Sequence, residues 1–220
     1  MKRVHVWGLA VVMALVITLL ICMKCVWGTG TGEKPVPHEE IRDSVFTTKA
    51  HRGYKEINYP TPKYDHDKIN EVQGVILHHT AEPTVERSLA ILTTNERNVS
   101  THVVIDTDGT RYILAEPERV TYHAGLSVLN GRESCNKFTI GIEFQGNTLE
   151  KPLTEEQIYS AIEYLKPLIK KYDIPLENIV THEMIRMAYK KKYPKKKCSG
   201  KVDITQEEYI RFMDVLKSTL

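Results

Sequence analysis

The sequence lacks a charge imbalance, an internal repeat and a dense set of cysteines. Its 220 residues carry 30 lysines and arginines against 28 aspartates and glutamates, a net charge of +2 that gives no argument for nucleic-acid binding. Without a repeat, a chain of this length fits one globular domain plus an appendage. The positive charge is concentrated between Lys190 and Lys201, where it predicts either a solvated loop or a surface that attracts an anionic polymer.

A single long apolar run extends from Val6 to Met23 and follows Lys2 and Arg3. Its length of about eighteen residues is near the minimum for spanning a bilayer and exceeds most signal-peptide cores. We therefore expect residues 1–27 to be a signal anchor that contacts the membrane or a cleaved signal peptide, with a lipoprotein as a third alternative. Each alternative places the remaining domain outside the cytoplasm, in the cell envelope.

Four cysteines are present, and two of them, Cys22 and Cys25, belong to the apolar segment. Outside the cytoplasm, Cys135 and Cys198 are free to form a disulfide. Such a bridge competes with any metal-binding role of Cys198, because a bridged sulfur is no longer a thiolate ligand.

Residues 28–58 are rich in glycine, proline and charge and predict a tether, followed by a domain over residues 59–220. Within the domain, apolar runs predict strands and capped amphipathic segments predict helices. The strands are expected over 72–77, 102–105, 111–114 and 138–144, and the helices over 85–95, 154–172 and 205–216. This alternation predicts an α/β fold with a mostly buried mixed β-sheet flanked by helices.

Two histidines and a cysteine in remote segments suggest a metal site. His78 ends an apolar strand, His182 follows another apolar stretch, and Cys198 follows a run of lysines. Two imidazoles and a thiolate leave a fourth zinc position open, as in hydrolytic rather than structural sites. His79 is not expected to share the metal, because adjacent strand residues face opposite sides.

Glu143 is a carboxylate inside the apolar strand Ile140-Gly141-Ile142-Glu143-Phe144. Burying an unpaired charge is costly, so we expect it to act as a general base beside the metal site. The alternative is a strand whose second face meets solvent.

These fragments occur together in a fixed order. They are Leu77-His78-His79-Thr80-Ala81, Ser100-Thr101-His102-Val103-Val104-Ile105, Tyr122-His123-Ala124-Gly125, Asn136-Lys137-Phe138-Thr139-Ile140-Gly141-Ile142-Glu143, and His182 with Lys196-Lys197-Cys198. The set resembles the zinc-dependent N-acetylmuramoyl-L-alanine amidases of the peptidoglycan recognition protein and phage amidase-type lysozyme superfamily. The resemblance runs from about Tyr59 to the C-terminus.

The resemblance implies a role for each matching residue. His78, His182 and Cys198 would bind Zn²⁺, Glu143 would act as the catalytic base, and Lys196 would stabilise the oxyanion. His123, Tyr122 and Asn136 would line the substrate groove. The implied substrate is the lactyl–L-alanine amide of peptidoglycan or a muropeptide, cut by a monomeric enzyme.

Several alternatives stay open. Lys201-Val202-Asp203 repeats the lysine–x–ligand spacing, so Asp203 is a second candidate for the third ligand. Thr101 stands where some relatives carry a catalytic tyrosine, which leaves the base role to Glu143. The long segment after His182 predicts an extra helix or a flap. A peptidoglycan-binding module without catalysis and a thiol hydrolase are the competing functions.

Overall fold

The computed structural model describes residues 53–94, 97–198, 200 and 203–220. The predicted signal or anchor segment, 1–27, and most of the predicted tether lie outside these residues. Within the described part of the chain, no helix is both long enough and apolar enough to span a bilayer.

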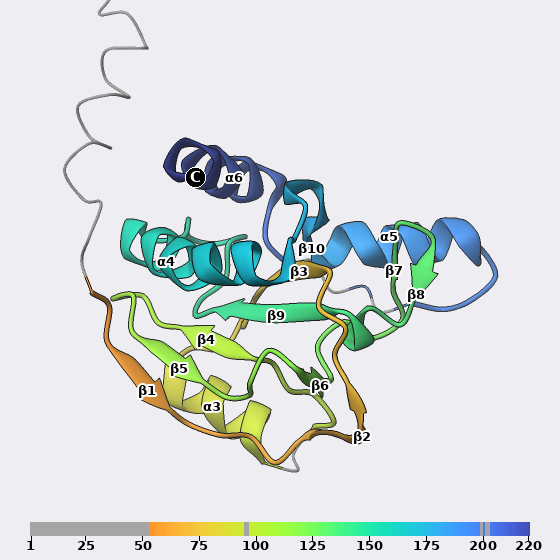
Figure 1. The fold of residues 1–220 in the computed structure, drawn as a ribbon, viewed down its shortest axis with the longest axis horizontal. Helices are drawn as coiled ribbons and strands as arrows, with labels where there is room; N and C mark the ends of the chain where they lie inside the picture. The colour runs from red at the N-terminus through yellow and green to blue at the C-terminus, as the bar shows by residue number, and fades with distance from the viewer. Residues whose placement is uncertain (1–52, 95–96, 199, 201–202) are drawn as a thin grey trace, which may run out of the picture. The chain divides into compact units, whose positions relative to one another are not determined.

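A six-stranded mixed sheet forms the centre of the domain, in the order β1-β5-β4-β9-β3-β10 (Figure 1). Its strands are β1 (Glu56–Asn58), β3 (Gly74–His79), β4 (Val103–Ile105), β5 (Arg111–Ile113), β9 (Thr139–Phe144) and β10 (Ile179–Thr181). Only the β4–β5 pair is antiparallel in this sheet. The predicted α/β fold with a mixed, mostly buried sheet is confirmed.

Short strands and helices complete the domain. Two small sheets pair β2 (Tyr64–Ile69) with β6 (Arg119–Thr121) and β7 (Val128–Leu129) with β8 (Arg132–Glu133). The helices are α3 (Val85–Thr93), α4 (Glu155–Tyr172), α5 (His182–Lys192) and α6 (Gln206–Thr219). Strand β1 falls inside residues 28–58, so the last three residues of the predicted tether belong to the sheet.

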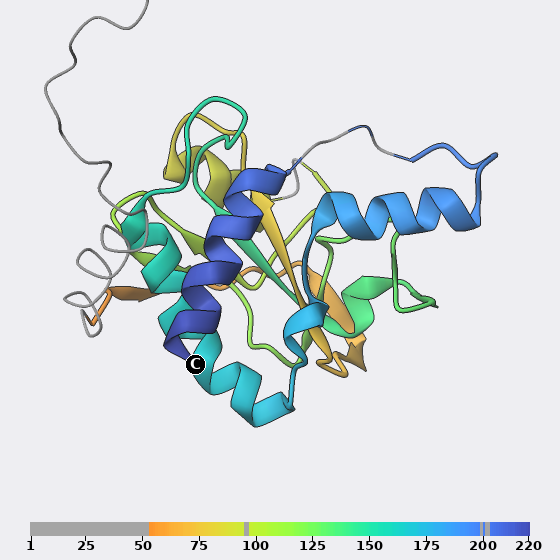
Figure 2. The ribbon, with the colours of Figure 1, turned by 90° about the horizontal axis from the view of Figure 1, so that it is seen from above.

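Both faces of the sheet are covered, which explains why β3 and β9 are buried along their whole length. Helices α4 and α6 lie side by side over one face (Figure 2) and pack on Leu77, Ile142 and Phe144. The opposite face carries two smaller apolar clusters, one under α3 around Val104 and one under α5 around Ile76. The functional residues described below lie on this second face.

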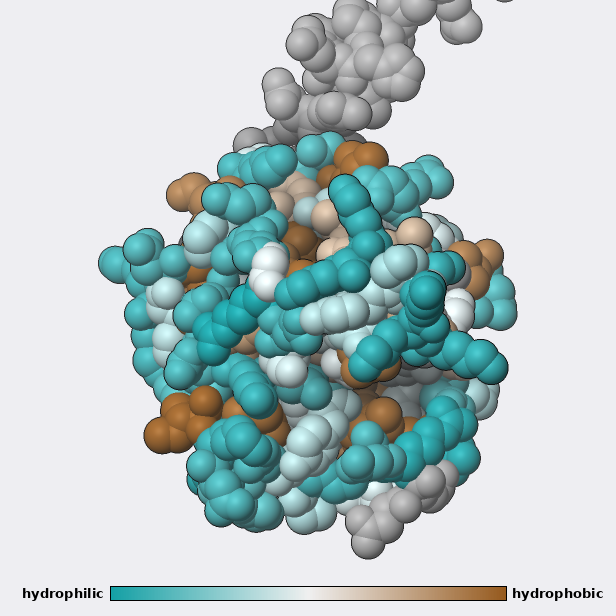
Figure 3. Space-filling view, turned by 90° about the vertical axis from the view of Figure 1, so that its right-hand side faces the viewer, coloured by the Kyte–Doolittle hydropathy of each residue, from teal (hydrophilic) through white to brown (hydrophobic). Residues whose placement is uncertain are grey.

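Helix α5 occupies most of the segment after His182, for which the sequence predicted a helix or a flap. It packs Ile185 and Tyr189 inward, and it ends in Lys190, Lys191 and Lys192. Basic residues at a helix C-terminus interact favourably with the helix dipole. The side of the domain where α5 ends is mainly hydrophilic (Figure 3), as the lysine-rich sequence predicted.

Candidate metal and catalytic site

Strand register places the first candidate residues next to one another. His78 at the end of β3 pairs with Glu143 of β9, so both side chains leave the same face of the sheet. Strand β10 pairs with β3 up to Thr181, and His182 follows as the first residue of α5. The Thr181 side chain caps this helix by accepting a hydrogen bond from a backbone N–H of its first turn. The cap fixes the direction in which α5, and with it His182, leaves the sheet.

Asp203 joins the two histidines. The donor atoms of His78, His182 and Asp203 lie within 4.8 Å of one another. Oδ2 of Asp203 is 2.6 Å from Nδ1 of His182 and 3.2 Å from Nδ1 of His78. Two imidazoles and one carboxylate oxygen form a donor set that suits a catalytic divalent metal with an open position.

Helix α6 holds Asp203 in place. Thr205 caps this helix, and its backbone N–H donates to the hydroxyl of Thr148 at 3.1 Å. Thr148 is in turn bonded to His79, whose Nδ1 accepts from the Thr148 backbone N–H at 3.0 Å. The His79 side chain therefore makes its hydrogen bond on the opposite face of β3 from His78, as expected for adjacent strand residues.

Cys198 does not belong to this group, and its prediction as the third ligand is corrected in favour of Asp203. Its thiol is partly exposed and lies 4.0 Å from the carbonyl oxygen of Lys196. The physical reason is the chain path: Cys198 lies in the loop after α5, whereas Asp203 is anchored just before α6. Cys135 and Cys198 are both free thiols, so the alternative of a disulfide between them is wrong.

Lys196 is exposed, with its ammonium 5.9 Å from the centre of the Tyr193 ring. It is not among the residues that line the cavity over the metal-binding group. Lys201, two residues before Asp203, lies outside the described residues.

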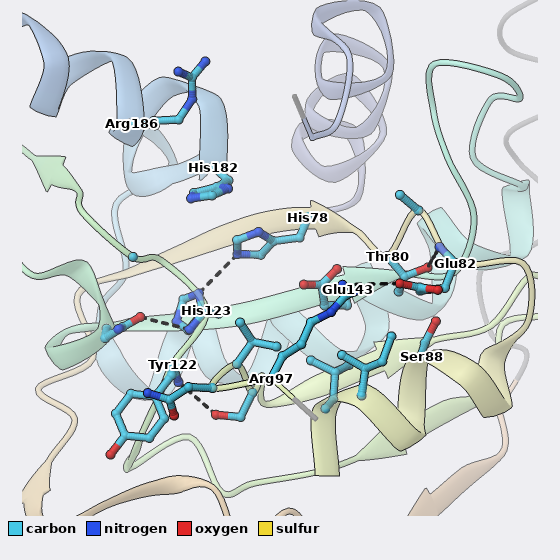
Figure 4. A pocket seen from close by; sticks show the side chains of 18 of the residues that line it. His78, Thr80, Glu82, Ser88, Arg97, Tyr122, His123, Glu143, His182 and Arg186 are labelled. Carbon is cyan, nitrogen blue, oxygen red and sulfur yellow. Dashed lines mark hydrogen bonds and ion pairs between the residues drawn. The ribbon is translucent and has the colours of Figure 1, made fainter. Parts of the chain in front are cut away.

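A cavity of about 710 Å³ is lined by His78, His182 and Glu143 among other residues (Figure 4). Glu143 is 8% exposed, and its Oε2 is buried without a hydrogen-bond partner in the described structure. A buried carboxylate oxygen without a partner costs free energy. The carboxylate therefore keeps an unused hydrogen-bond acceptor beside the cavity that Glu143 lines.

The three residues predicted to line the groove do so, together with others that the sequence did not single out. Tyr122, His123 and Asn136 line the cavity. Two cavity-lining arginines were missed: Arg186 from α5, which donates to Glu183 at 3.3 Å, and Arg97. Helical phase along α5 was the available signal for Arg186, because it lies one turn after His182.

Known proteins resemble this chain in sequence and in fold. The family model described as N-acetylmuramoyl-L-alanine amidase matches residues 68–201. The 1,6-anhydro-N-acetylmuramyl-L-alanine amidase AmpD of Escherichia coli is 34% identical over 156 residues, covering 71% of this chain and 81% of the relative. The Haemophilus influenzae AmpD is 38% identical over 90 residues, which cover 40% of this chain and 47% of that protein.

A further relative, the N-acetylmuramoyl-L-alanine amidase AmiD of Escherichia coli, is 29% identical over 126 residues, or 50% of this chain and 45% of that protein. The chain thus spans about half the length of AmiD and of the Haemophilus AmpD.

Solved structures share the fold. The crystal structure of a selenomethionine AmpD derivative superposes with a TM-score of 0.55 at 23% identity, covering 72% of this chain and 93% of that one. The structure of PlyL gives 0.56 at 18% identity, covering 77% and 99%. Because the family model covers more than half of the sequence, the chain belongs to the N-acetylmuramoyl-L-alanine amidase family.

Proposed function

We propose that this protein is a zinc-dependent N-acetylmuramoyl-L-alanine amidase that hydrolyses the amide between the lactyl group of N-acetylmuramic acid and L-alanine. The observation that carries the proposal is the convergence of His78, His182 and Asp203 beside the buried carboxylate of Glu143. The names of both relatives specify the amide between a muramic acid sugar and L-alanine. They differ in whether the sugar is the 1,6-anhydro form. We therefore propose the bond and leave the choice between polymer and fragment open.

His78, His182 and Asp203 would hold the zinc ion through two imidazole nitrogens and one carboxylate oxygen. When bound, zinc supplies Lewis acidity, which polarises a carbonyl oxygen and makes water a stronger acid. Glu143 takes the proton of the attacking water and returns it to the leaving amine. Glu143 lines the cavity, and its Oε2 has no hydrogen-bond partner that would compete for the proton in the described structure.

Assigning Asp203 instead of Cys198 as the third ligand also changes which lysine is expected to stabilise the oxyanion. The lysine–x–ligand spacing that selected Lys196 before Cys198 selects Lys201 before Asp203. We propose Lys201 as the residue that stabilises the oxyanion, and Lys196, exposed and outside the cavity lining, as the alternative. A Lys201→Ala variant should lose most of kcat, whereas Lys196→Ala should retain it.

The arginines at the cavity provide positive charge for a stem peptide, which carries carboxylates. Arg186 is 9% exposed and Arg97 lines the same cavity. Guanidinium groups bind carboxylates through paired hydrogen bonds. Both guanidinium groups already pair with a glutamate, Arg186 with Glu183 at 3.3 Å and Arg97 with Glu82 at 3.5 Å, so a carboxylate of the substrate would share or replace these partners.

The test uses the full-length chain, purified and stripped of metal, then incubated with muropeptides with and without added zinc. We expect zinc-dependent release of peptides that begin with a free L-alanine amine, detected by mass spectrometry. The matched variant Glu143→Gln should bind zinc as the wild type does and lose activity by 10²-fold or more, on the order expected for a general base. No release under any metal condition would overturn the proposal and leave the binding-module alternative.

The N-terminal segment supports a proposal on location. The apolar run from Val6 to Met23 after two basic residues suggests that the domain works outside the cytoplasm, at the cell envelope. Protease added to intact spheroplasts should digest the domain, whereas a cytoplasmic control protein should survive. Protection of the domain together with that control would contradict this location.

A further inference from the structure

His123 lies behind the metal-binding group rather than only at the wall of the cavity. Its Nδ1 is 3.2 Å from Nε2 of His78, the ring nitrogen on the far side from Asp203 (Figure 4). Its own Nε2 faces the hydroxyl of Thr139 at 3.5 Å. The imidazole therefore bridges a proposed metal ligand and a fixed polar group on β9.

The backbone and the ring of His123 are each held in place. Oδ1 of Asn136 accepts hydrogen bonds from the backbone N–H groups of His123 and Ala124, at 3.1 and 2.7 Å. The ring lies directly over Gly141, where a Cβ atom would be 2.6 Å from its Cγ. Only glycine at this position in β9 allows the ring to approach the strand so closely.

The hydrogen-bond directions can be followed from Thr139 towards the metal site. The Thr139 hydroxyl donates to the carbonyl oxygen of Cys135 at 2.7 Å, so its oxygen remains an acceptor for Nε2–H of His123. His123 then presents an unprotonated Nδ1, which accepts from Nε2–H of His78. That bond leaves the lone pair of His78 on Nδ1, the atom that faces Asp203.

With these tautomers, two hydrogen-bond acceptors face each other: Nδ1 of His78 and the carboxylate of Asp203. The Nδ1 lone pair of His78 and the carboxylate of Asp203 are 3.2 Å apart, and neither can donate a hydrogen bond in this arrangement. In this tautomer the two lone pairs repel each other, and a cation between them would remove the repulsion. The hydrogen-bond chain through His123 therefore prepares His78 for a metal ion.

We propose that His123 is a positioning residue that fixes the tautomer and the ring orientation of His78 for zinc, and not a substrate contact. The inference rests on the proposed zinc site. Groups that hold the second nitrogen of a metal-binding histidine typically change metal affinity by 10- to 100-fold when removed. Without metal the chain can reverse: Nδ1–H of His78 donates to Asp203, and the Thr139 hydroxyl turns to donate to Nε2 of His123.

Zinc affinity of the full-length chain, measured by competition with a chromogenic chelator, tests this role. His123→Phe, which removes the acceptor, should bind zinc about 10- to 100-fold more weakly. His123→Asn keeps an amide oxygen near the position of Nδ1 and should retain affinity within a few-fold. Tyr122→Phe is the matched control, because it removes a hydroxyl from a neighbouring cavity residue whose ring points away from His78 (Figure 4), and it should leave zinc affinity unchanged.

Nitrogen-15 NMR of the histidine rings gives a readout that does not depend on any variant. In the zinc-loaded wild type, His123 should carry its proton on Nε2 and accept at Nδ1. A proton on Nδ1 of His123 in the loaded protein would overturn the proposal. The measurement also decides the question if His123→Phe does not fold.

The outcomes separate this inference from the proposed function. A His123→Phe variant with wild-type zinc affinity and a raised KM would show a substrate contact and overturn only the positioning role. A wild-type chain that binds no zinc would overturn the proposed function, and this role with it.

Discussion

Asp203 and Cys198 each follow a lysine by two positions and lie five residues apart, so spacing alone cannot choose between them. The structure distinguishes them by anchoring. Asp203 is fully buried and immediately precedes a capped helix, whereas Cys198 is partly exposed in the loop after α5. A metal ligand has to be held in place by its surroundings. Of these two residues, only Asp203 is held in this way.

Substituting Asp203 and Cys198 separately tests which of them is the third ligand. Asp203→Ala should weaken zinc binding by more than about 100-fold, beyond the loss typical of removing a partner of a ligand. Cys198→Ser should keep its zinc through dialysis, as the wild type does. Metal content of both variants, measured by atomic emission, checks the expectation. Zinc retained in the Asp203 variant and lost from the Cys198 variant would reverse the assignment.

Gly141 is a second position where one residue decides the geometry of the site. A Cβ atom there would lie 2.6 Å from Cγ of His123 and 2.8 Å from Oγ1 of Thr101. Because the His123 backbone is fixed by Asn136, its ring has little freedom to move away. The glycine of the Gly-Ile-Glu fragment is thus explained by the histidine that packs on it.

Gly141→Ala should therefore lower the free energy of unfolding by about 1–3 kcal/mol, the usual cost of an overpacked core. Gly53→Ala is the control, since a Cβ at Gly53 meets nothing within 4 Å, and it should change stability by less than about 0.5 kcal/mol. Urea unfolding followed by circular dichroism measures both. Equal midpoints for the two variants would show that the His123 ring yields easily.

At the scale of elements, the sequence predicted the capped helices better than the short strands. The helix expected over 154–172 is α4, Glu155–Tyr172, and that expected over 205–216 is α6, Gln206–Thr219. Their caps are local signals made by a few consecutive residues. Strands β6, β7, β8 and β10 contain only two or three residues, too few for alternation to be recognised. Strands β4 and β5 are as short, but Asp108-Gly109 between them marks a hairpin turn.

The cap of α4 carries a testable contribution of its own. Thr154 accepts a hydrogen bond from the Gln157 backbone N–H at 3.1 Å, and its hydroxyl also donates to the carbonyl oxygen of Thr107 at 2.7 Å. Thr154→Ala should destabilise the fold by about 1–2 kcal/mol, whereas Thr154→Ser should be close to wild type. Because α4 covers the face of the sheet away from the metal-binding group, zinc affinity should not change. Thermal unfolding and the zinc competition assay together check both parts, and a large loss of zinc affinity in Thr154→Ala would contradict the separation of the two faces.

At the scale of the whole molecule, the site depends on strand order, which no local pattern contains. His78 and Asp203 are separated by 125 positions in the chain. They meet because β10 lies beside β3 and α6 returns over the same strand ends. The resemblance to a known family predicted that His78, His182 and Glu143 lie close together, and in the structure they do. It could not supply the hydrogen-bond chain through His123, which depends on side chains from three separate segments.

His102, on the same face of the sheet, is a buried histidine whose protonation should affect the stability of the whole domain. It is fully buried, its Nε2–H donates to the Arg119 carbonyl oxygen at 2.9 Å, and its Nδ1 accepts from the Gly141 N–H at 2.9 Å. A second proton would have to displace the Gly141 N–H. Burial lowers the pKa of His102 to about 4, against smaller opposing effects of the Arg119 carbonyl and the charge of Glu118.

Stability should therefore fall as the pH drops from about 6.5 to about 4. In this window the unfolded chain, whose histidine has a pKa near 6.5, binds a proton that the folded chain excludes. One such group lowers the free energy of unfolding by at most about 1.4 kcal/mol per pH unit. Urea unfolding of chelator-treated protein at several pH values, compared with His102→Asn, isolates this contribution because all other histidines are common to both chains. The wild type should lose stability more steeply than the variant towards pH 4, and parallel pH profiles would show that His102 accepts its proton without cost to the fold.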